Sequence, residues 1–114
     1  MNELRFHGLL GLAYRAKRLA MGEDSLLALS RGKTALVIVA SDSSTNTKKK
    51  ANDKGLYYQV PVLELSTKAE LGLALGKKAV AIICVNDKKL AQSILNIMKE
   101  GDVDGKIQKT SQQQ

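Results

Sequence analysis

The sequence predicts an α/β protein, a three-layer α/β/α sandwich around a small mixed sheet. Two runs of strand length, residues 34–40 and 79–85, are apolar apart from Thr34 and are typical of strands that helices cover on both faces. Segments with helical spacing of apolar residues surround these runs. The 114 residues are the size of one domain, which we place at residues 1–100, with a loose tail at 101–114.

The elements before the first buried strand are two helices. Apolar residues recur at helical spacing over residues 4–19, which predicts an amphipathic first helix. A short second helix is expected to begin at an N-cap, Asp24 or Ser25, and to stop at Gly32. The first buried strand follows directly.

The second half alternates in the same way. The polar residues 41–47 lead into a lysine-rich helix that is expected to end near Gly55. Residues 60–65 read as a strand, in which Pro61 disfavours a central position. A capping box at Thr67 and Glu70 opens the next helix, and a last helix is expected to follow the second buried strand.

The charge indicates a polyanionic partner. The chain has 18 Lys and Arg against 11 Asp and Glu, a net charge of +7. Residues 100–114 carry two lysines and three acids, so residues 1–99 hold +8. No apolar run is long enough to span a bilayer and no secretory signal is visible, so we expect a cytoplasmic protein without a membrane partner.

No pattern indicates an enzyme. The only histidine, His7, has no nucleophile or carboxylate at a telling spacing, and the only cysteine, Cys84, lies within a buried strand. Gly32-Lys33-Thr34 resembles the end of a phosphate-binding P-loop, but position 27 is leucine and the segment runs from helix to strand. We therefore expect no catalytic residues, no metal and no cofactor.

Basic and polar residues where strands end and helices begin form the candidate binding site, because helix N-termini attract phosphate. Lys48 and Lys49 follow Asn46 and Thr47 at one such helix start, although a lysine run on a helix is as often only a solvated face. With four aromatic residues and no tryptophan, base stacking on single strands is disfavoured and structured RNA fits better. The candidate residues are Gly22, Glu23, Asp24, Ser25, Arg31, Lys33, Asn46, Thr47, Lys48, Lys49, Leu65, Ser66, Thr67 and Lys68, with Arg15 and Arg18 around them.

An ordered set of motifs resembles the ribosomal protein L7Ae/L30e superfamily, and particularly its small bacterial YlxQ-like branch. The set comprises Gly11-Leu12-Ala13-x-Arg15-Ala16, Gly22, Arg31-Gly32-Lys33, Asp42-x-Ser44-x-Asn46-Thr47-x-Lys49-Lys50, Val60-Pro61 and Lys68-x-Glu70-Leu71-Gly72-x-Ala74-x-Gly76-Lys77. The resemblance implies an α/β/α sandwich that binds RNA, characteristically kink-turns, often in ribosomes. It assigns the segment that reads sheared G·A pairs to residues 22–25, and the loop that packs on unpaired nucleotides to residues 65–68.

The chain departs from this pattern at the second helix. Glu23 and Asp24 stand where the family has amide or cationic groups, and Ala28 or Leu27 replaces a lysine one helical turn later. A carboxylate can accept from base amino groups but repels phosphate, and Asp24 is equally well explained as a helix cap. We expect a monomer that binds structured RNA, such as ribosomal RNA. The alternative is a protein-interaction module on the same fold.

Overall fold

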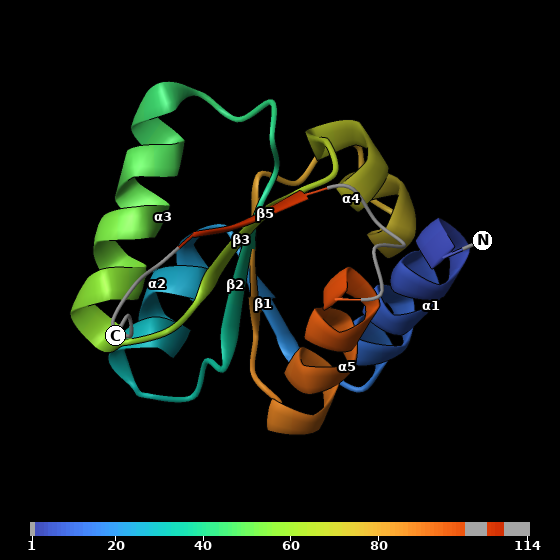
Figure 1. Cartoon of the computed structure of the whole chain (residues 1–114), viewed down its shortest axis with the longest axis horizontal. Helices are drawn as coiled ribbons and strands as arrows, with labels where there is room; N and C mark the ends of the chain where they lie inside the picture. Colours follow the sequence, from blue (N-terminus) through green and yellow to red (C-terminus); the bar gives the residue numbers. More distant parts are fainter. Residues whose placement is uncertain (1, 100–104, 109–114) are drawn as a thin grey trace.

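The computed structural model describes residues 2–99 and 105–108, and helices and strands alternate along these residues (Figure 1). The predicted fold class is confirmed. The elements are α1 Asn2–Arg15, β1 Leu19–Met21, α2 Glu23–Ser30, β2 Leu36–Val39, α3 Thr45–Tyr58, β3 Val62–Leu65, α4 Lys68–Leu75, β4 Ile82–Val85, α5 Lys88–Lys99 and β5 Gly105–Gln108.

The strands form a mixed sheet in the order β1-β4-β2-β3-β5. β2 and β3 run parallel, with Val37 opposite Val62, whereas β4 is antiparallel to both of its neighbours. β1, β2 and β3 therefore run in one direction. We call the end of the sheet where these three strands finish the carboxyl end, and the end where they start the amino end.

Helices cover both faces of the sheet, as the apolar runs predicted. α1, α4 and α5 lie on one face and α2 and α3 on the other (Figure 1). Successive strand residues alternate between the two layers: Leu36 and Ile38 join the larger core under α1, α4 and α5, whereas Val37 and Val39 face α2 and α3. All four residues of β2 are buried, which explains why this segment lacks any polar residue.

The first helix ends earlier than predicted, and a strand follows it. Helix α1 ends at Arg15 because Lys17 adopts the left-handed conformation (φ 60°), after which Leu19–Met21 pair with β4. Three half-buried residues are too few to show the alternation of apolar and polar side chains that predicts a strand. The first helix was therefore predicted to extend into this segment. The helix that was expected to end near Gly55 continues to Tyr58 and is capped by left-handed Gln59.

The C-terminal region also differs from the expectation of a loose tail. Residues 105–108 form β5, which pairs antiparallel with β3, Leu63 lying opposite Ile107. The backbone of β3 would otherwise lack partners on that side, and strand pairing supplies them whatever the side chains are. The rest of the predicted tail, residues 101–104 and 109–114, lies outside the described residues.

Candidate functional site

The carboxyl end of the sheet gathers the starts of three helices. Because β1, β2 and β3 all finish there, the α2, α3 and α4 helices all begin there (Figure 1). The loop between α4 and β4 reaches the same end, where Ala40 N donates to Ala81 O over 2.8 Å. The topology thus places the loops before α2, α3 and α4 at one edge of the sandwich.

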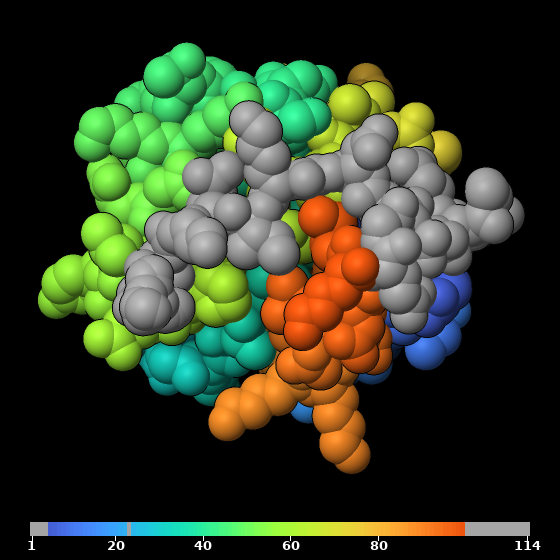
Figure 2. Space-filling model, viewed as in Figure 1, coloured from blue at the N-terminus to red at the C-terminus, as the bar shows by residue number. Residues whose placement is uncertain are grey.

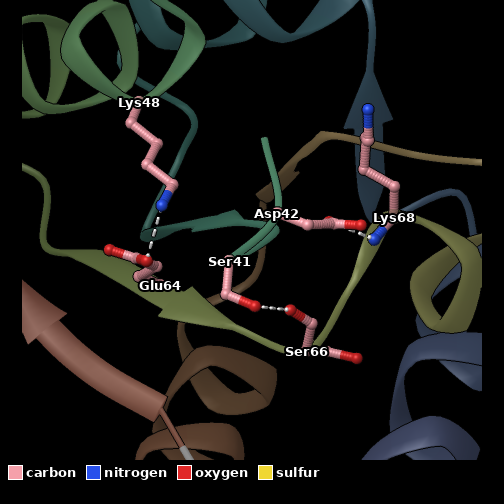
Figure 3. A network of polar contacts seen from close by, with 6 residues as sticks. All are labelled: Ser41, Asp42, Lys48, Glu64, Ser66 and Lys68. Atoms are coloured by element: carbon pink, nitrogen blue, oxygen red, sulfur yellow. Dashed lines mark hydrogen bonds and ion pairs between the residues drawn. The ribbon is translucent and has the colours of Figure 1, made fainter. Parts of the chain in front are cut away.

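A polar network fixes the β2–α3 loop against the β3–α4 loop (Figure 3). Both the backbone N–H and the hydroxyl of Ser41 donate to the carbonyl of Ser66. The Ser66 residue has a left-handed backbone conformation, with φ 66°. The Asp42 carboxylate accepts from the first backbone N–H of α4, at Lys68, over 2.8 Å. The Lys68 side chain stays half-buried, and this network holds its backbone in place.

The lysines at the start of α3 are partly neutralised by neighbouring carboxylates. Lys48 Nζ lies 3.0 Å from a carboxylate oxygen of Glu64 on β3, and Lys49 Nζ lies 2.9 Å from Asp53 one turn along the helix (Figure 3 shows the first pair). The backbone N–H of Thr47 donates to the N-cap Ser44, and Asn46 is exposed. This lysine run therefore offers less free charge than the sequence suggests.

A hollow of about 600 Å³ lies beside the start of α2. It is bounded by α1, β1, the first turn of α2 and the loop that precedes β4. Lys77 and Asp24 bring opposite charges to its wall, and the Lys77 ammonium lies 5.5 Å from the centroid of the Tyr14 ring. The lining residues are Tyr14, Leu19, Ala20, Met21, Gly22, Asp24, Lys77, Ala79, Val80, Ala81 and Ile82.

The first turn of α2 differs from both predicted caps. The N-cap is Gly22, with φ 60°, and it has no side chain to accept from the first amides of the helix. Asp24 therefore does not cap α2; it is exposed and lies in the first turn. Ser25 is buried, and both its N–H and its hydroxyl donate to the Gly22 carbonyl. α2 thus begins at a cap without a side chain that could accept from its first amides, beside an exposed carboxylate.

The loop of residues 76–81 was missed from the sequence although it forms one wall of the hollow. A β-carbon placed on Gly72 would lie 2.7 Å from Lys77 O and 2.8 Å from Ala79 N, so the loop packs directly on the backbone of α4. Gly76, with φ 72°, ends α4 and turns the chain into the loop. The glycines at positions 72 and 76 were the available signal, but the sequence alone did not show what packs against them.

Several predicted site residues lie elsewhere. Leu65 is buried in the core, and Thr67 is occupied as the N-cap of α4, where it accepts from Glu70 N over 3.1 Å. Arg31 and Lys33 occupy the turn between α2 and β2, at the amino end of the sheet. Positive charge alone did not show at which end of a strand these residues would lie. Glu23 is the first residue of α2.

The described residues offer no arrangement typical of an enzyme. The Cys84 thiol lies in the core, and burial raises its pKa to about 11, so it stays protonated. His7 Nε2 lies 3.9 Å from a carboxylate oxygen of Glu70, without a nucleophile beside them in the part of the chain described. Across residues 2–99 and 105–108, no group of His, Cys, Asp and Glu could hold a metal ion, and none of the helices there could cross a bilayer.

Comparison with known proteins adds sequence and fold relatives. The model of the ribosomal protein L7Ae/L30e/S12e/Gadd45 family matches residues 5–95. The chain is 36% identical to "RNA-binding protein YlxQ" of Bacillus subtilis (strain 168), over 86% of this chain and 99% of the relative. It is 46% identical to the protein of the same name from Enterococcus faecium, over 67% of this chain and 75% of the relative.

Two solved structures share the fold. A protein of unknown function from Bacillus halodurans C superposes with a TM-score of 0.78 at 37% identity, covering 82% of this chain and 96% of that one. The 15.5 kD RNA binding protein of Giardia lamblia superposes with a TM-score of 0.68 at 19% identity, covering 85% of this chain and 84% of that one. The second likeness concerns the fold alone.

Proposed function

Because the chain belongs to the ribosomal protein L7Ae/L30e/S12e/Gadd45 family, in its YlxQ-like branch, we propose that it is a non-enzymatic protein that binds structured RNA of the kink-turn type. We further propose that it acts in the cytoplasm on ribosomal RNA, as a ribosomal or ribosome-associated protein, and is a monomer when free. The names of its curated relatives and its charge of +7 support an RNA partner.

The single observation that carries this proposal is the hollow beside α2. It combines three kinds of group that can contact RNA: amides at a helix N-terminus, a carboxylate at Asp24 and an ammonium at Lys77. The first backbone amides of α2 and the Lys77 ammonium would bind phosphate oxygens, whereas the carboxylate would accept from the amino groups of base edges. Lys78, on the same loop, is exposed and would add a further phosphate contact.

The rest of the carboxyl end would position the RNA. Asn46 and Lys68 lie in the first turns of α3 and α4, directly after the loops that the polar network around Ser41 and Asp42 holds together. A rigid edge of this kind favours an RNA that is already folded, because neither partner then loses much conformational freedom on binding. Of the residues predicted for this site, Gly22, Asp24, Asn46, Thr47, Lys48, Lys49, Ser66 and Lys68 stay in the proposal, and Lys77 and Lys78 join them.

The test compares two RNAs by fluorescence anisotropy over 50–300 mM salt. One probe is a kink-turn, and the other has its sheared G·A pairs replaced by Watson–Crick pairs. We expect tighter binding of the kink-turn, and we expect Asp24→Ala to reduce this preference while Lys77→Ala weakens binding of both probes. Equal affinity of the wild-type protein for both probes at every salt concentration would refute kink-turn recognition.

A protein-interaction module remains the second candidate, and one observation favours it. Leu26 and Leu27 on α2 are 45% and 48% exposed, and Leu27 lines a hollow of about 500 Å³ with Lys54 and Tyr58 of α3. Under this function, Leu27→Ser would abolish capture of a protein partner, and purified protein would carry no RNA. An absorbance ratio at 260 and 280 nm that falls after ribonuclease treatment would instead favour RNA.

A further inference from the structure

The amino end of the sheet brings three turns together around the end of β4. The backbone N–H of Asn86 donates to the Arg18 carbonyl over 2.7 Å, which joins β4 to the turn between α1 and β1. On the other side, the Thr34 hydroxyl donates to the Asn86 side-chain oxygen over 3.0 Å, which joins β4 to the turn between α2 and β2. The start of α5 completes the group, because Asp87 caps it by accepting from Leu90 N.

These three turns carry a dense positive charge, which we call the amino-end patch. Residues 16–19, 30–35 and 86–90 contain six cations and one acid, so the patch has a charge of +5. The acid, Asp87, already caps α5 and lies 3.7 Å from Arg18 Nε. All six basic side chains are exposed, and they are Lys17, Arg18, Arg31, Lys33, Lys88 and Lys89.

The patch is continuous across the end of the molecule. Lys88 lines a hollow of about 380 Å³ together with Thr34 and Ala35, so the start of α5 adjoins the turn before β2. Figure 2 shows side chains of the orange segment at the start of α5 extending from the lower end of the molecule, beside the blue-green segment that follows α2. A single extended polyanion can therefore touch more than one turn at once.

One cation of the patch occupies an unfavourable backbone conformation. Lys17 has a φ of 60°, where residues with a β-carbon lose roughly 1 kcal/mol relative to glycine. Its N–H donates to the Tyr14 carbonyl and the following N–H, of Arg18, donates to Ala13, as at a helix end where glycine is usual. A lysine here adds charge at a cost in stability, which is consistent with a function for that charge.

We propose that the amino-end patch is a second RNA-binding surface, which contacts the phosphate backbone of an RNA duplex without reading its sequence. The three turns contain no aromatic residue and none of the exposed large apolar residues. Stacking on bases is therefore absent from this surface, and so are the apolar side chains by which proteins insert into a membrane. Lysine and arginine contacts to phosphates are what these turns can provide.

The basic side chains of this surface lie at the opposite end of the sheet from the first turn of α2, although Leu19 at its border also lines the hollow beside that turn. The strand β2, Leu36–Val39, joins the two ends, and an extended strand advances about 3.3 Å per residue, so it alone separates them by roughly 10 Å. One RNA helix at the carboxyl end and another at the amino end would thus be held on opposite ends of one rigid sheet. The proposal shares with the proposed function only the premise that the polyanion is RNA.

The test uses a 20-base-pair RNA duplex without a kink-turn, with log Kobs measured against log salt. Lys88→Gln/Lys89→Gln and Arg31→Gln/Lys33→Gln each remove two charges from different turns. If the pairs contact phosphates, each variant should weaken binding at least about tenfold at 50 mM salt, and the slope should become shallower by about 1.8. The matched control, Lys54→Gln/Lys99→Gln, removes the same net charge elsewhere and should keep the wild-type slope.

A further pair of variants separates charge from folding. Lys17→Gly relieves the left-handed strain and removes a charge, so it should weaken duplex binding while unfolding at the same or higher denaturant concentration. Gln59→Gly relieves the same strain without a charge change and should leave binding unaltered. The proposal is overturned if the amino-end variants bind the RNA duplex as tightly as the wild type, or if the Lys54/Lys99 control weakens duplex binding equally. It is also overturned if the amino-end variants lose only binding to phosphatidylserine vesicles and keep binding to the duplex. The kink-turn preference of Asp24→Ala tests only the proposed function at the carboxyl end and does not test the amino-end patch.

Discussion

The close contact between α4 and the following loop makes Gly72→Ala an informative perturbation. A β-carbon at this position would meet three backbone atoms, of Lys77, Lys78 and Ala79, at 2.7–2.8 Å. None of these atoms belongs to a flexible side chain, so the loop itself has to move. Because this loop forms a wall of the hollow beside α2, the substitution should affect both stability and RNA binding.

The magnitude follows from the distances. Ordinary contacts of a β-carbon begin at 3.4 Å, so the loop must retreat by about 0.7 Å from the atom now at 2.7 Å. Overpacking of this kind costs about 1–3 kcal/mol. Alanine also gains up to about 1 kcal/mol over glycine within a helix, which would mask part of that cost. Gly8→Ala provides the control, because Gly8 lies within α1 and its added β-carbon meets nothing within 4 Å.

The assay is unfolding in guanidinium chloride followed by circular dichroism. Gly8→Ala should raise the free energy of unfolding slightly, and Gly72→Ala should lie about 1–3 kcal/mol below it, because the helix-propensity gain is common to both. Kink-turn RNA should bind more weakly to Gly72→Ala only. If the two variants gained the same stability and bound RNA equally well, the contact between α4 and the loop would not have the importance we assign to it.

Three further predictions concern caps and the buried thiol. Ser44→Ala removes the N-cap of α3, which accepts from Thr47 N over 3.1 Å, and should lower the free energy of unfolding by about 1 kcal/mol in denaturant titrations. Gln59→Gly should raise it by up to about 1 kcal/mol, since φ is 59° there, and a loss would contradict the left-handed cap. Burial raises the pKa of Cys84 from 9.0 to about 11, so the folded state binds more protons between these values. Its contribution to stability is therefore complete below pH 9 and is lost as the pH rises towards 11, and Cys84→Ala should flatten that part of the stability profile.

The layers of the fold could be predicted because each strong signal was local. The four residues of β2 are all buried, and an apolar run records burial directly in the sequence. The helix start at Thr67 was marked by a side chain that does accept from the backbone amide of Glu70, three residues later. The short strand β1 left no such mark, because its pairing with β4 depends on residues more than sixty positions away.

The candidate site was predicted in part for the same reason. Asn46 and Lys68 follow predicted strands, so a rule about strand ends placed them at one edge, whereas Gly22 was added only because it precedes a helix. The wall formed by Lys77 and Ala79 depends on the packing of α4 and on Tyr14 from α1, which no local pattern encodes. Arg31 was assigned to the wrong end because its positive charge carries no information about topology.

The pairing of β5 with β3 bears on how the chain avoids aggregation while it is being made. Until residues 105–108 leave the ribosome, Val62–Leu65 present unpaired N–H and C=O groups along a strand of three buried apolar residues and one glutamate. Such an open edge can recruit a strand from another nascent chain. β5, which is synthesised after the other four described strands, therefore covers an edge that is open to intermolecular pairing until then, and a truncation before Gly105 should favour insoluble protein.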